Sequence, residues 1–140
     1  MPAANAGYSG KPLWQKLGLC RGQRLLAVAA PPHLDQLLAG APAGVRRLSR
    51  SAPFDVALVF VVERTALGTA LDRLLPRLAE GGMIWVAWPK KTSGVATDVT
   101  EDVVRAVALP LGIVDVKVCA IDATWSGLKF LRRREAGADG

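Results

Sequence analysis

FDVALVFVV, residues 54–62, is the stretch that decides the fold of this 140-residue chain. It is long, rich in β-branched residues and apolar on both faces, which predicts a strand at the centre of a sheet. Two further apolar runs, LLAVAA at 25–30 and MIWVAW at 83–88, predict neighbouring strands that are also buried on both faces. Together the three runs predict the parallel centre of one sheet.

The segments between these runs predict the connections. Leucines recur at helical spacing over 67–78, and Pro76 is expected to kink or break that helix because proline lacks an N–H group. We expect a short helix at 33–38, a second strand at 45–49 and a turn at the glycines 81–82. Strands that alternate with helices imply right-handed parallel crossovers.

The C-terminal segments complete the sheet. A helix around 103–107 is expected to start from Thr97 or Asp98 as N-cap and to stop before a proline. Alternating residues predict a half-exposed strand at 114–121, with its valines on one face. The connection to the last strand, 128–132, is too short for a parallel crossover, so that strand is expected to run antiparallel.

The predicted fold class is therefore α/β. We expect a single Rossmann-like three-layer domain over 1–140, with a mainly parallel sheet and an antiparallel C-terminal strand. A short helix at 11–18 precedes the first strand. The ordered part is expected to span about 8–134, with flexible tails at 1–7 and 135–140 because both ends are small, polar and rich in Gly and Ala.

Composition and charge narrow the function classes. The chain is 51% hydrophobic and 21% charged, which is enough for an ordinary core, and Cys20 and Cys119 are expected to be reduced thiols. The N-terminus lacks the apolar stretch of an export signal, and no apolar run is long enough for a membrane helix, so a soluble cytoplasmic protein without membrane contact is expected. The net charge of +6 is spread along the chain, so we do not expect specific nucleic-acid binding.

Three blocks of sequence are more distinctive than the periodicity. They are YSGKPL at 8–13 with KLG at 16–18, WPKKTSGVATD at 88–98 and WSGLK at 125–129. With the order of strands and helices, the chain resembles a shortened class I methyltransferase fold, and on these blocks it resembles the bacterial domain-of-unknown-function family 3052. The resemblance runs from about Tyr8 to Arg134. It implies the fold and supplies no reaction, cofactor or site residue.

The usual nucleotide cofactors find little support in the sequence. Dinucleotide-binding folds need a glycine-rich turn after the first strand and an acidic residue after the second. Here the turn reads Ala30-Pro31-Pro32-His33, and RRLSR at 46–50 contains no acid. We therefore expect no cofactor, and in particular no tight binding of S-adenosylmethionine or NAD in the usual mode.

One constellation remains as a candidate ligand site, because ligands bind at the carboxyl ends of parallel strands. The loop after 83–88 and the turn before 128–132 are expected to meet there. The candidate ligand-binding residues are Lys90, Lys91, Thr92, Ser93, Thr97, Trp125 and Ser126. Cations, hydroxyls and an indole suit an anionic or nucleotide-like small molecule. Solvated lysines, core tryptophans and helix capping are the alternative explanation of the same residues.

Catalytic and metal-binding residues are not identified. His33 is the only histidine, and the cysteines do not complete a zinc site at any recognised spacing. His33 is conceivable as a general base, but a residue at a helix N-terminus is the simpler interpretation. The function predicted from sequence is a non-catalytic small-molecule-binding or regulatory module. The alternatives left open are an enzyme acting on an anionic ligand at the 89–97 loop and a weak nucleic-acid-binding protein; partners and oligomeric state stay open as well.

Overall fold

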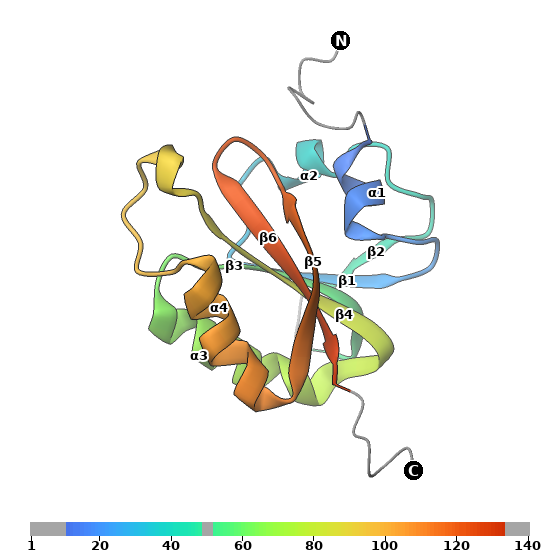
Figure 1. Ribbon diagram of the computed structural model, residues 1–140. Coiled ribbons are helices and arrows are strands. Elements are labelled where there is room, and N and C mark those ends of the chain that lie inside the picture. Colours follow the sequence, from blue (N-terminus) through green and yellow to red (C-terminus); the bar gives the residue numbers. More distant parts are fainter. Residues whose placement is uncertain (1–10, 49–51, 134–140) are drawn as a thin grey trace.

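The strands form one mixed sheet with helices on both faces (Figure 1). The computed structural model describes residues 11–48 and 52–133, where the sheet has six strands in the order β2-β1-β3-β4-β6-β5. The tails expected at 1–7 and 135–140 lie outside these residues. The strands are β1 (Arg24–Val28), β2 (Arg46–Leu48), β3 (Phe54–Phe60), β4 (Leu78–Pro89), β5 (Ile113–Ala120) and β6 (Trp125–Arg132).

Strand directions agree with the predicted α/β class. The first four strands pair in parallel, and β6 pairs antiparallel with both β4 and β5. The central position of β3 follows from its sequence, because six of its seven residues are buried. The predicted parallel centre and the antiparallel last strand are confirmed.

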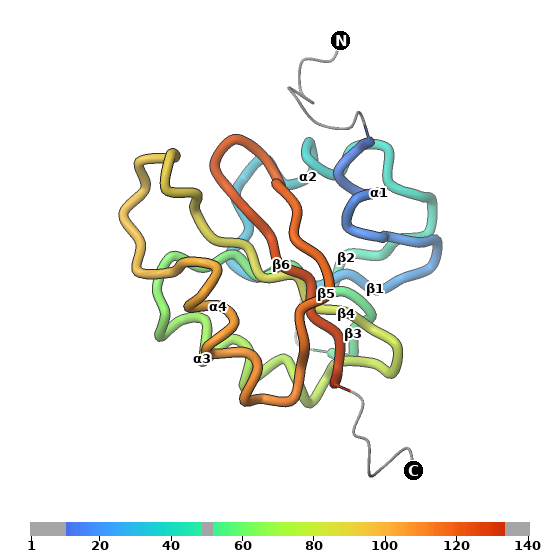
Figure 2. The backbone as a smooth tube through the Cα atoms, in the orientation of Figure 1, coloured from blue at the N-terminus to red at the C-terminus, as the bar shows by residue number. Residues whose placement is uncertain are grey.

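The helices divide into two layers, as the backbone trace also makes visible (Figure 2). They are α1 (Leu13–Leu17), α2 (Leu34–Leu37), α3 (Arg64–Leu74) and α4 (Glu101–Ala108), with the 3₁₀ turns η2 (Leu75–Arg77), η3 (Lys91–Ser93) and η4 (Leu109–Leu111). One hydrophobic cluster joins α3 and α4 to one face of the sheet. A second cluster joins α1 and α2 to the other face. Within the described residues, no helix is long and apolar enough to cross a membrane.

Prolines and glycines set several boundaries. Pro76 breaks the predicted long helix as expected, since α3 ends before it and η2 contains it. The turn expected at 81–82 is wrong, because β4 runs through both glycines. A Cβ at Gly82 would lie 2.7 Å from the carbonyl oxygen of Asp55, at a register irregularity between β3 and β4. The glycine therefore lets two strands approach closely.

The regular alternation predicted for β5 is also interrupted. Its register with β6 shifts between Asp115 and Lys117, which places Val116 at an irregularity of the ladder. Val116 and Val118 are 50% and 53% exposed at this edge of the sheet. The N-cap of α4 is Thr100, whose side chain accepts from the Val103 N–H, so the prediction of Thr97 or Asp98 in that role is wrong.

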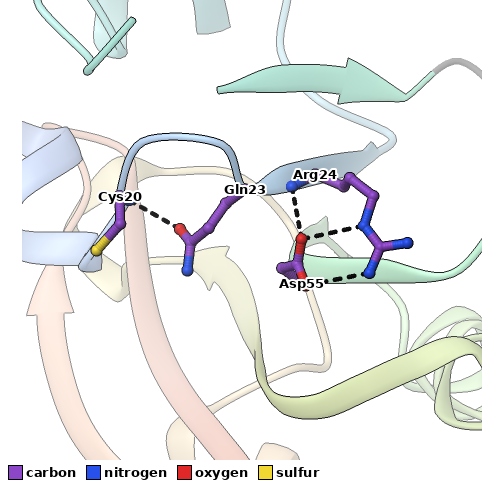
Figure 3. Close-up of polar contacts among 4 residues, drawn as sticks. All are labelled: Cys20, Gln23, Arg24 and Asp55. Atoms are coloured by element: carbon purple, nitrogen blue, oxygen red, sulfur yellow. Dashed lines mark hydrogen bonds and ion pairs between the residues drawn. The ribbon is translucent and has the colours of Figure 1, made fainter. Parts of the chain in front are cut away.

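An ion pair fixes the amino ends of the central strands (Figure 3). Asp55 Oδ2 accepts from the backbone N–H and Nε of Arg24, at 2.8 and 3.1 Å, and Oδ1 accepts from its Nη2 at 3.2 Å. The hydrogen bond from the Arg24 side chain lowers the pKa of the Asp55 carboxyl, although its partial burial opposes the shift. Nearby, Gln23 Oε1 accepts from the Cys20 N–H. These contacts lie at the edge opposite the carboxyl ends of the parallel strands.

Candidate functional site

The order of the strands creates a topological switch point at the carboxyl edge of the sheet. From β1 the chain crosses to β2 on one side, and it then returns to place β3 on the other side of β1. In open α/β sheets, ligands bind outside the carboxyl ends of the strands at such a switch point. The edge between the carboxyl ends of β1 and β3 is therefore the first place to look for a site.

The turn after β1 has an unusual backbone. Ala29 has φ = 55°, the only positive φ at a non-glycine residue in the described part of the chain. This left-handed conformation is one that glycine adopts without strain, and residues held in it cluster at functional sites. The sequence therefore lacks the expected glycine while the backbone keeps a glycine-like turn.

A histidine and a carboxylate face each other beside this turn. His33 Nε2 lies 3.0 Å from Asp122 Oδ2, and the two side chains are 44% and 19% exposed. His33 precedes α2, as predicted, but its side chain does not cap the helix. Asp122 belongs to the turn between β5 and β6, so this contact joins residues that are 89 positions apart in the sequence.

Asp122 is held rigidly. Its Oδ1 accepts from the backbone N–H groups of Thr124 and Trp125, both at 2.8 Å. Burial of the carboxyl opposes ionisation, but the hydrogen bonds from His33, Trp125 and Thr124 outweigh it and lower the pKa of Asp122. Sequence reasoning missed Asp122; the signal available was an Asp two residues before Thr124 in a short connection, a pattern typical of a side chain that closes its own turn.

A separate hollow of about 360 Å³ lies on the other side of the β5–β6 turn. Four of the predicted residues line it, namely Lys90, Lys91, Thr97 and Ser126. The rest of its wall consists of Trp88, Pro89, Val99, Thr100 and Glu101. The structure therefore brings the end of β4, the loop after it, the start of α4 and the start of β6 together, as the sequence predicted for the loop and the strand ends.

Three predicted residues are not among those lining the hollow. The indole of Trp125 packs edge-on against Phe60 of β3, with ring centroids 5.1 Å apart, and belongs to the cluster on the α1 and α2 face. Ser93 serves its own loop, because its hydroxyl donates to the Lys90 carbonyl at 2.7 Å and accepts from the Val95 N–H at 3.1 Å. Thr92 is exposed within η3.

Thr97 has a structural contact at the hollow. Its hydroxyl donates to the Val62 carbonyl at 2.6 Å and accepts from the Val99 N–H at 3.0 Å. These bonds tie the loop after β4 to the segment that follows β3. The ligand-binding role assigned to the predicted residues remains a prediction.

The charge of the hollow is positive. Glu101 in its wall is paired with Arg105 at 2.6 Å, and Arg105 also contacts Asp115 at 3.0 Å. Lys90 and Lys91 form no ion pair within the described residues. Two ammonium groups without an ion-pair partner, beside one carboxylate that is paired with Arg105, favour an anionic ligand. The described part of the chain contains no group of three or more His, Cys, Asp or Glu side chains that could hold a metal ion.

The resemblance to class I methyltransferases implies a nucleotide-type methyl donor at the switch point. The left-handed backbone of Ala29 fits a close approach, but Pro31 and Pro32 supply no N–H groups. The strand β2 ends in Arg47 and Leu48, so its described residues offer no carboxylate to a ribose. The residues do not fit such a donor in the usual mode.

Comparison with known proteins identifies the fold. No family model and no curated protein matches the chain. Among solved structures, ribosomal protein L11 methylase from Lactobacillus delbrueckii subsp. bulgaricus is 9% identical with a TM-score of 0.58, and the match covers 87% of this chain and 76% of that one. A methyltransferase from Pyrococcus furiosus is 12% identical with a TM-score of 0.57, covering 87% and 81%. A putative type 11 methyltransferase from Sulfolobus solfataricus is 12% identical with a TM-score of 0.57, covering 81% and 86%.

These neighbours correct the function predicted from sequence. The prediction of a non-catalytic binding or regulatory module is wrong, because several solved structures that share the fold are described as a methylase or methyltransferases. The missing glycine turn was given too much weight, since the backbone conformation of that turn is present without the glycine. At these identities the likeness establishes the fold: the chain has a class I methyltransferase-like Rossmann fold.

Proposed function

We propose that this chain is an S-adenosylmethionine-dependent methyltransferase. The observation that carries the proposal is the left-handed turn at Ala29, which follows β1 at the switch point between β1 and β3, in a fold shared with proteins described as methyltransferases. The shared fold supports this class of reaction, and the switch point is where the donor would bind.

The donor would be bound weakly. A ribose without a carboxylate partner loses a charge-assisted hydrogen bond, which contributes about 1.5–3 kcal/mol. Each 1.4 kcal/mol is tenfold in affinity, so the expected dissociation constant is about ten- to a hundredfold above that of a site with the acid.

The acceptor in this proposal is an anionic small molecule. Lys90 and Lys91 beside the hollow would bind its charged end, with Ser126 as a hydroxyl partner. The ends of β4 and β1 are two strand spacings apart, about 10 Å. An acceptor that reaches from the hollow to a donor at the end of β1 is therefore elongated.

The test has a binding arm and a transfer arm. Isothermal titration calorimetry with S-adenosylmethionine and S-adenosylhomocysteine should give weak saturable binding. Incubation with methyl-tritiated donor and 4-hydroxybenzoate, caffeate or adenosine monophosphate should label an anionic acceptor. The double change Lys90→Ala, Lys91→Ala should raise KM for the acceptor and leave donor binding unchanged. Absence of donor binding at millimolar concentration would refute the proposal.

The family to which we assign the chain is proposed from the three distinctive blocks of sequence. We propose membership of the domain-of-unknown-function family 3052 on residues 11–13 and 16–18, 88–98 and 125–129, with the rest of the first block outside the described residues. We also propose one domain over 1–140 and a location in the cytoplasm. Limited proteolysis that yields two stable fragments, or fractionation with the cell envelope, would contradict these assignments.

A further inference from the structure

We propose that His33 is the proton-accepting residue of this site and that Asp122 positions it. The inference deepens the proposed methyltransferase function, on which the choice of reaction rests. It starts from the 3.0 Å contact between His33 Nε2 and Asp122 Oδ2, which joins the segment after β1 to the β5–β6 turn. A base whose ring is oriented by a third group is the arrangement that general-base catalysis requires.

The contacts of Asp122 determine which ring nitrogen is available. Its Oδ1 is occupied by the N–H groups of Thr124 and Trp125, so Oδ2 is the oxygen that faces the imidazole. An ionised carboxylate has no proton to give, and the neutral imidazole must donate from Nε2. Nδ1 then carries the lone pair, and no hydrogen bond within the described residues occupies it.

Exposure separates the roles of the two side chains. The imidazole is 44% exposed and can be reached from solvent, whereas the carboxylate is 19% exposed and accepts hydrogen bonds from its own turn. A partly exposed ion pair contributes little to stability, typically about 0–1 kcal/mol. Stability alone is therefore a weak reason for a histidine and an aspartate to meet across four neighbouring strands of the sheet.

The chemical step is a proton transfer. The Nδ1 lone pair takes the proton of an acceptor O–H or N–H group, and the electron pair of that bond stays on the acceptor atom. The acceptor becomes a stronger nucleophile, and the ring becomes an imidazolium whose charge is offset by Asp122. A group positioned in this way contributes about 10²- to 10⁴-fold to a rate.

The only histidine in the chain makes the test direct. In protein labelled with ¹⁵N at the ring, the two nitrogen shifts at pH 8.5 should report a neutral imidazole protonated at Nε2. In Asp122→Asn, the amide oxygen should stay on the N–H groups of Thr124 and Trp125, which turns the amide NH₂ toward His33. The ring should then be protonated at Nδ1.

Activity measurements distinguish a general base from a residue with only a structural role. His33→Gln can still donate to Asp122 but cannot accept a proton, so kcat should fall about 10²- to 10⁴-fold with KM unchanged. The kcat of His33→Ala should fall equally, and added imidazole should restore part of the rate. His33→Gln at the wild-type rate would overturn the proposal, and so would a ring that is protonated at Nδ1 in the wild type or is unaffected by Asp122→Asn.

The experiments distinguish a failure of the methyltransferase proposal from a failure of the role proposed for His33. If the wild-type protein methylates none of the three probe acceptors, the methyltransferase proposal fails, and the ring shifts alone decide whether Asp122 fixes Nδ1 as the free nitrogen. If methylation occurs but His33→Gln retains full rate, the methyltransferase proposal stands and the role of His33 is refuted.

Discussion

Replacing Trp85 by Phe tests how α1 is attached to the sheet. Trp85 is fully buried in β4, and its Nε1 donates to the Leu17 carbonyl at 3.0 Å. Leu17 is the last residue of α1, where carbonyl groups lack partners within the helix. The indole therefore supplies a side-chain donor to a helix end that is buried against the sheet.

The expected cost has two parts. Leaving a buried carbonyl without a partner costs about 1–3 kcal/mol. The void left by the smaller ring adds about 1 kcal/mol. Trp85→Phe should therefore lower the free energy of unfolding by about 2–4 kcal/mol.

Trp88→Phe is the matched control. Trp88 lies in the same strand, is 6% exposed in the other hydrophobic cluster and makes no hydrogen bond through its side chain among the described residues. Its replacement should cost only about 1 kcal/mol for the void. Urea unfolding followed by circular dichroism gives both values if the slope is unchanged. Equal losses for the two variants would refute the role of the Leu17 contact.

Four further outcomes are expected. Val59→Ala, in the fully buried centre of β3, should cost about 2 kcal/mol or more in urea unfolding, and a loss under about 1 kcal/mol would show that the site is not core. Lys90→Ala with Lys91→Ala should change stability by less than about 0.5 kcal/mol while raising acceptor KM, and an unfolded double variant would show a structural role. Ala29→Gly should stabilise by up to about 1 kcal/mol, since relief of the left-handed strain exceeds the added chain entropy, and a lower melting temperature would contradict this. The lowered pKa of Asp55 gives stability that is present above about pH 4 and lost as pH falls through that pKa, so Asp55→Asn should flatten the acid limb of the stability curve; parallel curves would refute it.

The strands could be predicted because each buried strand is a run of consecutive apolar residues. Residues 54–62 are apolar on both faces, which only a central position in the sheet satisfies, and β3 occupies that position. The glycines 81–82 were misread because glycine is common in turns. The sequence does not reveal that the backbone of a neighbouring strand comes so close to Gly82 that a Cβ there would lie 2.7 Å from a carbonyl oxygen.

The residues that line the hollow could be predicted only in part, because the sequence did not reveal which face of the sheet each residue of β6 points to. Trp125 and Ser126 are adjacent, so once β6 begins at Trp125 they must point to opposite faces of the sheet. Ser126 reaches the hollow, and Trp125 contacts Phe60 on the other face. Their assignment to a turn allowed both to point one way. The pairing of His33 with Asp122 could not be foreseen, because no local pattern connects residues 89 positions apart.

The same register divides the carboxyl edge of the sheet into two parts. The hollow with Lys90 lies toward the α3 and α4 face, and the pair of His33 and Asp122 lies toward the α1 and α2 face. A hydrogen bond from the Lys90 N–H to the Thr124 carbonyl, at 2.8 Å, joins the two through the β5–β6 turn. Because β6 begins at the edge where the parallel strands end, one short turn contributes to both parts. In the proposed reaction, an acceptor held by its charge in the hollow would have to cross this turn to bring its reacting group to His33, so the turn would set the length of the acceptor.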